Sequence, residues 1–260
     1  MDNLVTLDSV SKFFTASGGM FKSGSEFAAV DNLSLNILKG RSLGIVGESG
    51  SGKTTTARMI CDIYKPDKGK IFYKDRLINS LGNDYESYRK NVQMVFQDPY
   101  NSLNPKLTVR SALSDGIKQY ITKDLKEINE RLCFLMKMVG LSEEYLDRYP
   151  HEFSGGQRQR ISIARALSLE PELIIADEPV SSLDVSVQAQ ILNLMKGLKE
   201  GGVTFILISH SLATVSFLCD DIAVMYKGKL VEYGETIKVL EAPKSNYTMS
   251  LLNASLYFEG

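Results

Sequence analysis

Short runs of apolar residues alternate along the chain with segments in which apolar residues recur at helical spacing. Buried strands of parallel sheets read as continuous apolar runs. Four such runs predict core strands, at residues 43–46, 92–96, 173–176 and 203–208. Strands are also predicted at 4–10 and 27–37, and a β-hairpin at 222–226 and 230–233 around Lys227-Gly228-Lys229. The alternation of strands and helices predicts an α/β fold.

The pattern changes between residues 98 and 169, where strand-like runs vanish and helical spacing takes over at 106–120 and 123–139. We therefore expect a helical subdomain inserted into the α/β core. The Gly- and Ser-rich segment 15–27 predicts a surface loop. The expected organisation is a single domain over residues 1–260, with a core at 1–97 and 170–260 and a helical subdomain at 98–169.

Composition and charge narrow the class of protein. The 260 residues are 43% apolar and 23% charged, which is ordinary for a soluble globular protein. Thirty basic and 31 acidic side chains leave a net charge of −1, which argues against a main role in coating nucleic acid or an anionic membrane. No apolar run approaches the ~18 residues of a spanning helix, and the N-terminus lacks the pattern of a secretory signal. Three scattered cysteines predict free thiols in a reducing cytoplasm.

A phosphate-binding loop is predicted directly after the run 43–46. The residues match G-x-x-x-x-G-K-[ST] and precede a helical segment that extends toward Pro66. They are Gly47, Glu48, Ser49, Gly50, Ser51, Gly52, Lys53 and Thr54. Lys53 is expected to reach the β- and γ-phosphates, Thr54 to ligate Mg²⁺, and Thr55 to touch the α-phosphate. The alternative is a Gly-rich turn with a surface lysine.

Two adjacent carboxylates follow the run 173–176. Neighbouring side chains at a strand end point to opposite sides. We therefore assign Asp177 to the magnesium shell and Glu178 to the general base that activates water. Taken alone, this pair also fits an acidic loop after a strand.

The same placement recurs along the chain. Gln97 follows the run 92–96, and Ser209-His210 end the run 203–208. Each of the four apolar strands thus delivers a polar group at its carboxyl end. In open α/β sheets, ligands bind at that edge. A lone histidine after a strand is more often structural, but four coincident placements favour a shared nucleotide site.

A second glycine-containing helix start is predicted at Ser154-Gly155-Gly156-Gln157, and Ser154 with Gln157 fits a capping box. Two glycines in a first turn lower helix stability by about 1 kcal/mol each, so close approach of backbone to an anion is one reason for them. We infer that a γ-phosphate lies between two such surfaces. The alternative is a capped helix with no other role.

Together these motifs resemble those of the ATP-binding cassette (ABC) family, in the family's order and over nearly the whole chain. The matching segments are GESGSGKTT, VFQDPYNSLNP, FSGGQRQR at 153–160, LIIADEP, Ser181-Ser182-Leu183-Asp184 and Ser209-His210. VFQDPYNSLNP, DVSVQAQ and APKSNYTMSLL carry a closer resemblance to the ATPase subunits of oligopeptide, dipeptide and nickel importers.

The resemblance implies a P-loop NTPase core with a mainly parallel sheet, an N-terminal antiparallel β subdomain and an inserted helical subdomain. It implies ATP and Mg²⁺ as ligands and adds roles for single residues. Gln97 senses Mg²⁺ and the γ-phosphate, and His210 touches the γ-phosphate. Ser154 and Gly156 contact ATP bound to the other subunit, and Asp184 organises the subunit interface. Phe14 stacks on adenine, with Phe13 or a plain core role for Phe14 as alternatives.

The expected function is ATP hydrolysis that drives uptake of peptides, nickel or metal chelates. The resemblance implies a second ATPase subunit, identical or different, two membrane-spanning permease subunits and, indirectly, an extracytoplasmic solute-binding protein. It places the chain peripherally on the cytoplasmic face of the cell membrane, with no nucleic-acid partner. Two other classes of P-loop protein fit the sequence less well. A P-loop kinase would lack the SGGQ helix and the late His210, and a cassette acting on ribosomes or DNA usually carries two cassettes or coiled coils.

Overall fold

The structure, a computed structural model, describes residues 2–15, 26–98, 100 and 102–258. The chain forms two compact units. The first unit comprises Met1–Tyr85 and Thr204–Gly260, and the second comprises Glu86–Val203. The helical subdomain predicted at 98–169 falls within the second unit, and its boundaries stay a prediction.

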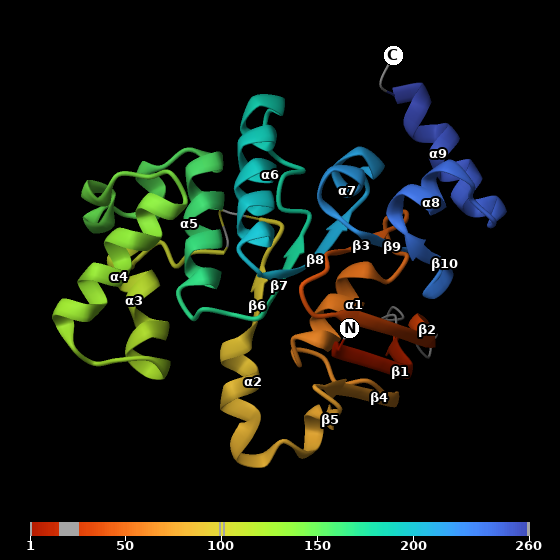
Figure 1. The fold of residues 1–260 in the computed structure, drawn as a ribbon, viewed down its shortest axis with the longest axis horizontal. Helices are drawn as coiled ribbons and strands as arrows, with labels where there is room; N and C mark the ends of the chain where they lie inside the picture. The colour runs from red at the N-terminus through yellow and green to blue at the C-terminus, as the bar shows by residue number, and fades with distance from the viewer. Residues whose placement is uncertain (1, 16–25, 99, 101, 259–260) are drawn as a thin grey trace, which may run out of the picture. The chain divides into compact units, whose positions relative to one another are not determined.

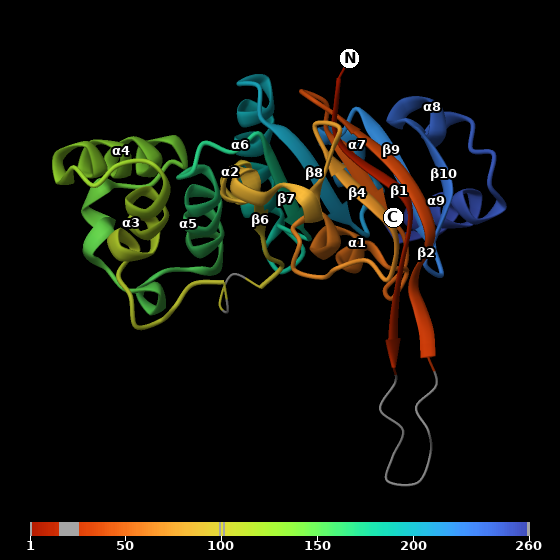
Figure 2. The same cartoon turned by 90° about the horizontal axis from the view of Figure 1, so that it is seen from below.

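An antiparallel sheet in the first unit has the strand order β2-β1-β4-β5. Its strands are β1 (Asn3–Thr15), β2 (Glu26–Leu38), β4 (Lys68–Tyr73) and β5 (Arg76–Leu77). Figure 2 shows β1 and β2 as a long paired ribbon beside β4. Alternating burial along β2, with Leu33, Leu35 and Ile37 buried between exposed polar residues, explains why one face of this sheet packs inward.

A mixed sheet in the first unit contains the phosphate-loop strand β3 (Leu43–Val46), which pairs in parallel with β8 (Thr204–Ser209) and β9 (Asp221–Tyr226). All side chains of β3 and β8 are buried, as expected for central parallel strands. β9 forms the predicted antiparallel hairpin with β10 (Lys229–Glu235).

The helices of the first unit pack around these sheets. They are α1 (Lys53–Ile60), α7 (Leu212–Leu218), α8 (Thr236–Glu241), α9 (Asn246–Phe258) and the 3₁₀ turns Ile78–Ser80 and Gly82–Asp84. The sequence predicted that this helix would extend toward Pro66, which is wrong, because α1 ends at Ile60. Asp62 takes a positive φ of 53°, and the amides of Ile63 and Tyr64 turn back to the carbonyl of Arg58, which closes the helix.

The second unit combines two parallel strands with a group of helices. Its elements are α2 (Tyr85–Asn91), β6 (Val92–Val95), α3 (Val109–Tyr120), α4 (Leu125–Met138), the 3₁₀ turns Glu143–Asp147 and Pro150–Glu152, α5 (Gly155–Leu167), β7 (Leu173–Asp177) and α6 (Val185–Glu200). Figure 1 shows α3 and α4 beside α5. Leu113 and Ile117 of α3, Leu132 of α4 and Ile161 of α5 are buried.

Most of the predicted elements are confirmed. The helices predicted at 106–120 and 123–139 are α3 and α4, and each apolar run forms a strand. The predicted surface loop 15–27 falls largely on residues 16–25, which lie outside the described residues, while β1 reaches Thr15 and β2 begins at Glu26. Within the described part of the chain, no helix has the length and apolarity required to cross a membrane.

Candidate functional site

The predicted phosphate loop links β3 to α1, which begins at Lys53. The Lys53 side chain is buried, and its ammonium group donates hydrogen bonds to the carbonyl oxygens of Gly47 at 2.7 Å and Glu48 at 2.8 Å. The loop therefore wraps around the lysine, and the positive end of α1 lies at the same place. This arrangement suits a bound anion.

Two glycines of the loop cannot be replaced without strain. Gly47 has φ 150°, and a Cβ there would lie 2.1 Å from the carbonyl oxygen of Met225. Gly52 has φ 101°, and a Cβ there would lie 2.3 Å from the carbonyl oxygen of Ala29. The motif glycines thus allow the left-handed backbone and the close approach of neighbouring strands that the loop needs.

Sequence reasoning missed three residues that brace this loop. The backbone N–H of Gly228 donates to the carbonyl of Ser51 at 3.1 Å, and Met225 lies against Gly47. The hydroxyl of Tyr247 accepts a hydrogen bond from the N–H of Glu48 at 3.1 Å. The hairpin signal around Gly228 was visible in the sequence, but its contact with the loop was not.

His210 lies at the same sheet edge as the phosphate loop. β3 and β8 run in parallel, and their last residues, Val46 and Ser209, are paired. Gly47 and His210, which directly follow these two strands, therefore lie at the same edge of the sheet. The His210 side chain is exposed. In the first unit, the predicted convergence of polar groups at strand ends is therefore present for these two segments.

The second unit brings together Gln97 and Glu178. β6 and β7 run in parallel with Val95 paired to Ala176, so the residues that follow both strands meet at one edge. The side-chain amide of Gln97 donates to a carboxylate oxygen of Glu178 at 3.0 Å. This hydrogen bond orients the carboxylate predicted to act as general base.

The two adjacent acids have different surroundings. Asp177 is the last residue of β7 and is buried, whereas Glu178 is partly exposed. Glu178 has φ 46°, a left-handed backbone that residues other than glycine rarely adopt. Its carbonyl accepts hydrogen bonds from the N–H and the hydroxyl of Ser181. A strained turn of this kind is common where a side chain must be aimed.

Helix α5 begins after Ser154, at the helix start that the sequence predicted for Ser154-Gly155-Gly156-Gln157. Ser154 is the N-cap, and it forms a capping box in which its hydroxyl accepts from the N–H of Gln157 and the Gln157 side chain accepts from the N–H of Ser154. The structure also gives a second reason for one glycine. A Cβ on Gly156 would lie 2.4 Å from Val187 of α6, whereas one on Gly155 would make ordinary contacts, 3.4 Å from Leu183.

Asp184 caps helix α6. Its carboxylate accepts hydrogen bonds from the hydroxyl of Ser186 at 2.7 Å and the N–H of Val187 at 3.0 Å. These bonds, first that of Ser186 and then that of Val187, lower the pKa of Asp184 below its usual value. The carboxylate is exposed and ionised near neutral pH. Asp184 can therefore cap α6 and still offer a charged side chain to the predicted subunit interface.

Phe14 lies in a small aromatic cluster of the first unit. Its ring is 5.5 Å from that of Tyr64 in an edge-on arrangement and 6.1 Å from that of Phe27, and it is half-buried. Each of the two rings also has an ammonium group over it, that of Lys12 5.7 Å from the Phe14 centroid and that of Lys68 5.3 Å from the Phe13 centroid. The partly open ring of Phe14 is consistent with stacking on a base and equally with packing.

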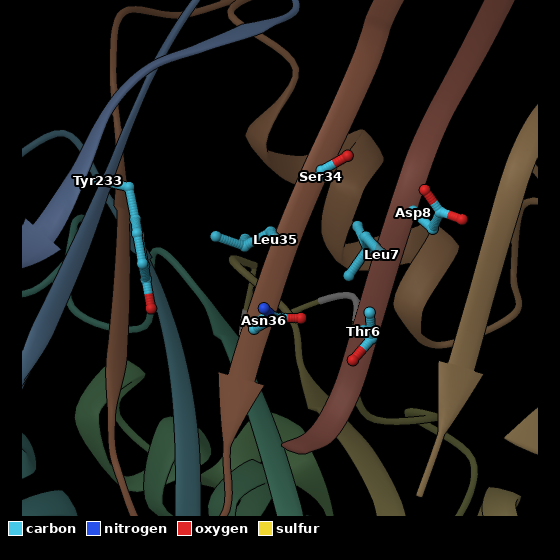
Figure 3. Close-up of a pocket in the computed structure, with 7 residues that line it drawn as sticks. All are labelled: Thr6, Leu7, Asp8, Ser34, Leu35, Asn36 and Tyr233. Atoms are coloured by element: carbon cyan, nitrogen blue, oxygen red, sulfur yellow. The ribbon is translucent and has the colours of Figure 1, made fainter. Parts of the chain in front are cut away.

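A separate hollow of about 330 Å³ in the first unit does not resemble a catalytic site (Figure 3). Tyr233 of β10 faces Leu35 and Asn36 of β2, and the carboxylate of Asp8 points away from Tyr233. Asp8 is the single carboxylate in the lining. The hollow therefore lacks a group of convergent acids or bases, and the predicted site residues lie elsewhere.

The chain is similar to known proteins over most of its length. A family profile described as "ABC transporter" matches residues 30–181. The chain is 46% identical over 257 residues to the oligopeptide transport ATP-binding protein AppF of Bacillus subtilis, covering 97% of this chain and 78% of AppF. It is 44% identical to the dipeptide transport ATP-binding protein DppF of Haemophilus influenzae, covering 94% of this chain and 75% of DppF.

Solved structures show the same fold. The ATP-binding cassette MJ0796, in a dimeric post-hydrolysis state bound to ADP and Pi, matches with a TM-score of 0.78 at 30% identity, covering 89% of this chain and 98% of that one. CbiO1 of Clostridium perfringens, part of the transporter complex cbiONQ, matches with a TM-score of 0.78 at 26% identity over the whole of both chains. The predicted P-loop NTPase fold is thereby confirmed. The chain belongs to the ABC transporter family and is one of its ATPase cassettes, an enzyme that couples ATP hydrolysis to transport.

Proposed function

We propose that this chain is the ATP-hydrolysing subunit of an importer for oligopeptides or dipeptides. The names of its relatives AppF and DppF favour peptides as the solute. Uptake of nickel or a metal chelate, which the sequence also suggested, is tested by the same experiment. The observation that carries the proposal is the hydrogen bond from Gln97 to Glu178 at the carboxyl ends of β6 and β7.

ATP phosphates bind to the phosphate loop in this proposal. The glycine-rich residues 47–52 provide backbone N–H groups, Lys53 balances the charge of the β- and γ-phosphates, and Thr55 contacts the α-phosphate. When ATP binds, the Lys53 ammonium would donate to phosphate oxygens in place of the carbonyl oxygens of Gly47 and Glu48, or in addition to them. Phe14 stacks on the adenine ring, for which a flat apolar ring suffices.

Hydrolysis requires a base and a hydrogen-bond network around the γ-phosphate. Glu178 takes a proton from the attacking water, and Gln97 fixes the direction of that carboxylate through its amide. His210 donates to a γ-phosphate oxygen from the end of β8. Ser154, Gly155, Gly156 and Gln157 of a second cassette contact the nucleotide from its other side, and Asp184 organises the interface between the cassettes.

Mg²⁺ fits the donor set of these residues. The proposed ligands are Thr54, Gln97 and Asp177, all of which offer oxygen atoms, and Mg²⁺ is usually held by one or two carboxylates together with substrate phosphates. Among the described residues no group of three His, Cys, Asp or Glu could hold a metal by itself. When bound, the ion neutralises charge that develops on the phosphates.

Transport requires partners that provide the channel. We propose two membrane-spanning permease subunits, a second ATPase subunit that is identical or related, and an extracytoplasmic solute-binding protein that acts through the permeases. In this proposal the chain lies peripherally on the cytoplasmic face of the membrane. Nucleic acid has no part in it, in keeping with the net charge of −1.

Reconstituted vesicles test the proposal. The chain is co-expressed with its co-purifying membrane subunits, and uptake of labelled peptides and of nickel is measured with the wild type and with Glu178→Gln. ATP-dependent peptide uptake that is lost in Glu178→Gln is expected. Uptake of nickel but not of any peptide would contradict the proposed solute, and uptake that Glu178→Gln leaves intact would contradict the assignment of the base.

A further inference from the structure

The C-terminal helix α9 begins beside the phosphate loop, although the two segments lie 199 positions apart in the sequence. Tyr247, in the first turn of α9, extends its side chain to the loop, and its hydroxyl accepts a hydrogen bond from the N–H of Glu48 at 3.1 Å. Both segments belong to the first unit.

The N–H of Glu48, which donates to Tyr247, belongs to the same peptide group as the carbonyl of Gly47, which accepts a hydrogen bond from Lys53. The carbonyl of Gly47 and the N–H of Glu48 belong to one planar trans peptide, so they point in opposite directions. The carbonyl accepts from the Lys53 ammonium at 2.7 Å, and the N–H donates to Tyr247 at 3.1 Å. A rotation of this peptide plane would move both partners together.

Tyr247 is itself fixed by two sets of contacts. Its ring packs against Tyr226 at the end of β9, with ring centroids 4.3 Å apart. The start of α9 is held by Glu232 of β10, whose carboxylate oxygens accept from the N–H groups of Lys244 at 2.8 Å and Ser245 at 3.1 Å. The hydroxyl of Ser245 accepts from the N–H of Tyr247 at 3.2 Å, as in a helix N-cap.

The charge of Glu232 suits this holding role. Burial alone would raise the pKa of Glu232, but the neighbouring Thr248 hydroxyl and the two backbone N–H groups outweigh burial and lower that pKa below its usual value. Glu232 is therefore ionised at neutral pH and is a strong acceptor for the turn that precedes α9.

We propose that Tyr247 is a positioning residue for ATP binding, which fixes the Gly47–Glu48 peptide and through it the ammonium group of Lys53. The proposal rests on the assignment of Lys53 to the phosphates in the proposed function. Such coupling is reciprocal, because a contact that strengthens nucleotide binding is strengthened by the nucleotide to the same extent. Bound ATP therefore stabilises the start of α9.

Tyr247→Phe tests the hydroxyl alone, since the ring and its packing on Tyr226 remain. Loss of one hydrogen bond predicts an ATP dissociation constant about 2- to 10-fold above that of the wild type. The turnover number at saturating ATP should change little, because Glu178 is not displaced. The matched control is Tyr233→Phe, which removes a hydroxyl from an exposed tyrosine on β10. That control should bind ATP as the wild type does.

Hydrogen exchange distinguishes a positioning role of Tyr247 from a purely structural one, which would not make the exchange of α9 depend on the nucleotide. Amides of residues 246–254 should exchange more slowly in the wild type when a non-hydrolysable ATP analogue is added, and this protection should be lost in Tyr247→Phe. Glu232→Gln, which weakens the anchor of α9 and leaves Tyr247 in place, should show reduced protection and a smaller loss of affinity.

Clear results would overturn the inference. The inference is wrong if the ATP dissociation constant is unchanged in Tyr247→Phe, or if it changes equally in Tyr233→Phe. It is also wrong if the hydrogen exchange of α9 in the wild type is the same with and without the nucleotide. This last measurement uses the wild type alone, so it does not depend on the folding of a variant. Lys53→Ala separates this failure from failure of the proposed function: if Lys53→Ala loses ATP binding while Tyr247→Phe does not, only the role of Tyr247 is wrong.

Discussion

The side-chain amide of Gln97 donates a hydrogen bond to the carboxylate of Glu178 over 3.0 Å, between the ends of two parallel strands. A neutral amide in this place orients the carboxylate without neutralising its charge. The hydrogen bond reduces the rotational freedom of the carboxylate. The pair therefore predicts separable effects on chemistry and on nucleotide binding.

Glu178→Gln should lower the rate of ATP hydrolysis by about 10²- to 10⁴-fold, since a general base is lost. ATP affinity should remain close to that of the wild type, because the phosphate loop is unchanged. Steady-state hydrolysis and equilibrium ATP binding measure the two quantities. Glu130→Gln, a change of the same type on the exposed face of α4, is the control. Hydrolysis that persists at the wild-type rate would transfer the base role elsewhere, with His210 as the next candidate.

Gly156→Ala should destabilise the protein because its Cβ would lie 2.4 Å from Val187. Overpacking of this kind typically costs about 1–3 kcal/mol, partly offset by the helix propensity of alanine. Gly155→Ala has room and should be neutral or stabilising. Urea unfolding measures both changes.

The space around Val187 provides an internal check. In a Val187→Ala background the same Gly156→Ala change should be tolerated, and the difference between the two backgrounds is the coupling energy of the pair. Equal effects of Gly156→Ala in both backgrounds would show that packing on α6 is not the reason for this glycine.

Phe14→Ala should raise the dissociation constant of ATP, because stacking of an aromatic ring on a base is worth about 1–3 kcal/mol. Its effect on the binding of inorganic triphosphate, which has no base, should be small. Titration with the two ligands separates base stacking from damage to the phosphate loop. If Phe13→Ala shows this selective loss and Phe14→Ala does not, the stacking residue is Phe13.

Asp67 should make stability depend on pH. Its carboxylate accepts from the N–H of Phe13 at 2.7 Å and the ammonium of Lys12 at 2.9 Å, and these bonds, that of Phe13 first, lower its pKa. An acid with a lowered folded-state pKa stabilises the fold above its unfolded pKa of about 3.9, and that stability is lost as pH falls through the folded value.

The measurement is urea unfolding of the wild type and Asp67→Asn at pH 6 and at pH 3. The wild type should be the more stable protein at pH 6, and its advantage should shrink at pH 3. Lys12→Ala removes one of the two donors and should keep part of the effect. An advantage that is equal at both pH values would show that the carboxylate charge of Asp67 does not contribute.

Local patterns in the sequence predicted much of the fold because they follow from local physics. The spacing of Ile128, Leu132 and Met136 predicts α4, and the side chains of these residues are buried as expected. The capping box at Ser154 and Gln157 is confirmed for the same reason, since all its atoms lie within four residues. Strands β4 and β5 and helix α2 were not predicted, because residues 68–91 are rich in charged residues and show no clear period.

Contacts between distant segments could not be predicted in this way. The sequence around Tyr247 shows only a polar stretch before an apolar one, and nothing in it indicates Glu48. The glycine at 156 was explained by an anion, whereas the structure adds a packing reason that depends on Val187 in the next helix. Both cases require knowledge of which elements become neighbours, and a single sequence does not contain that information locally.

The position of β3 has a consequence for synthesis of the chain. Leu43 pairs with Ile206 and Asp221, and the loop that follows receives a hydrogen bond from Gly228. Translation proceeds at about 5–20 residues per second, so roughly 8–30 s separate the appearance of β3 from that of its first partner strand. During that interval the nascent chain contains the complete phosphate-binding motif with both edges of β3 unpaired, a condition that invites aggregation. ATP can therefore begin to stabilise the newborn protein only after strands β8 and β9 and the turn at Gly228 have been synthesised.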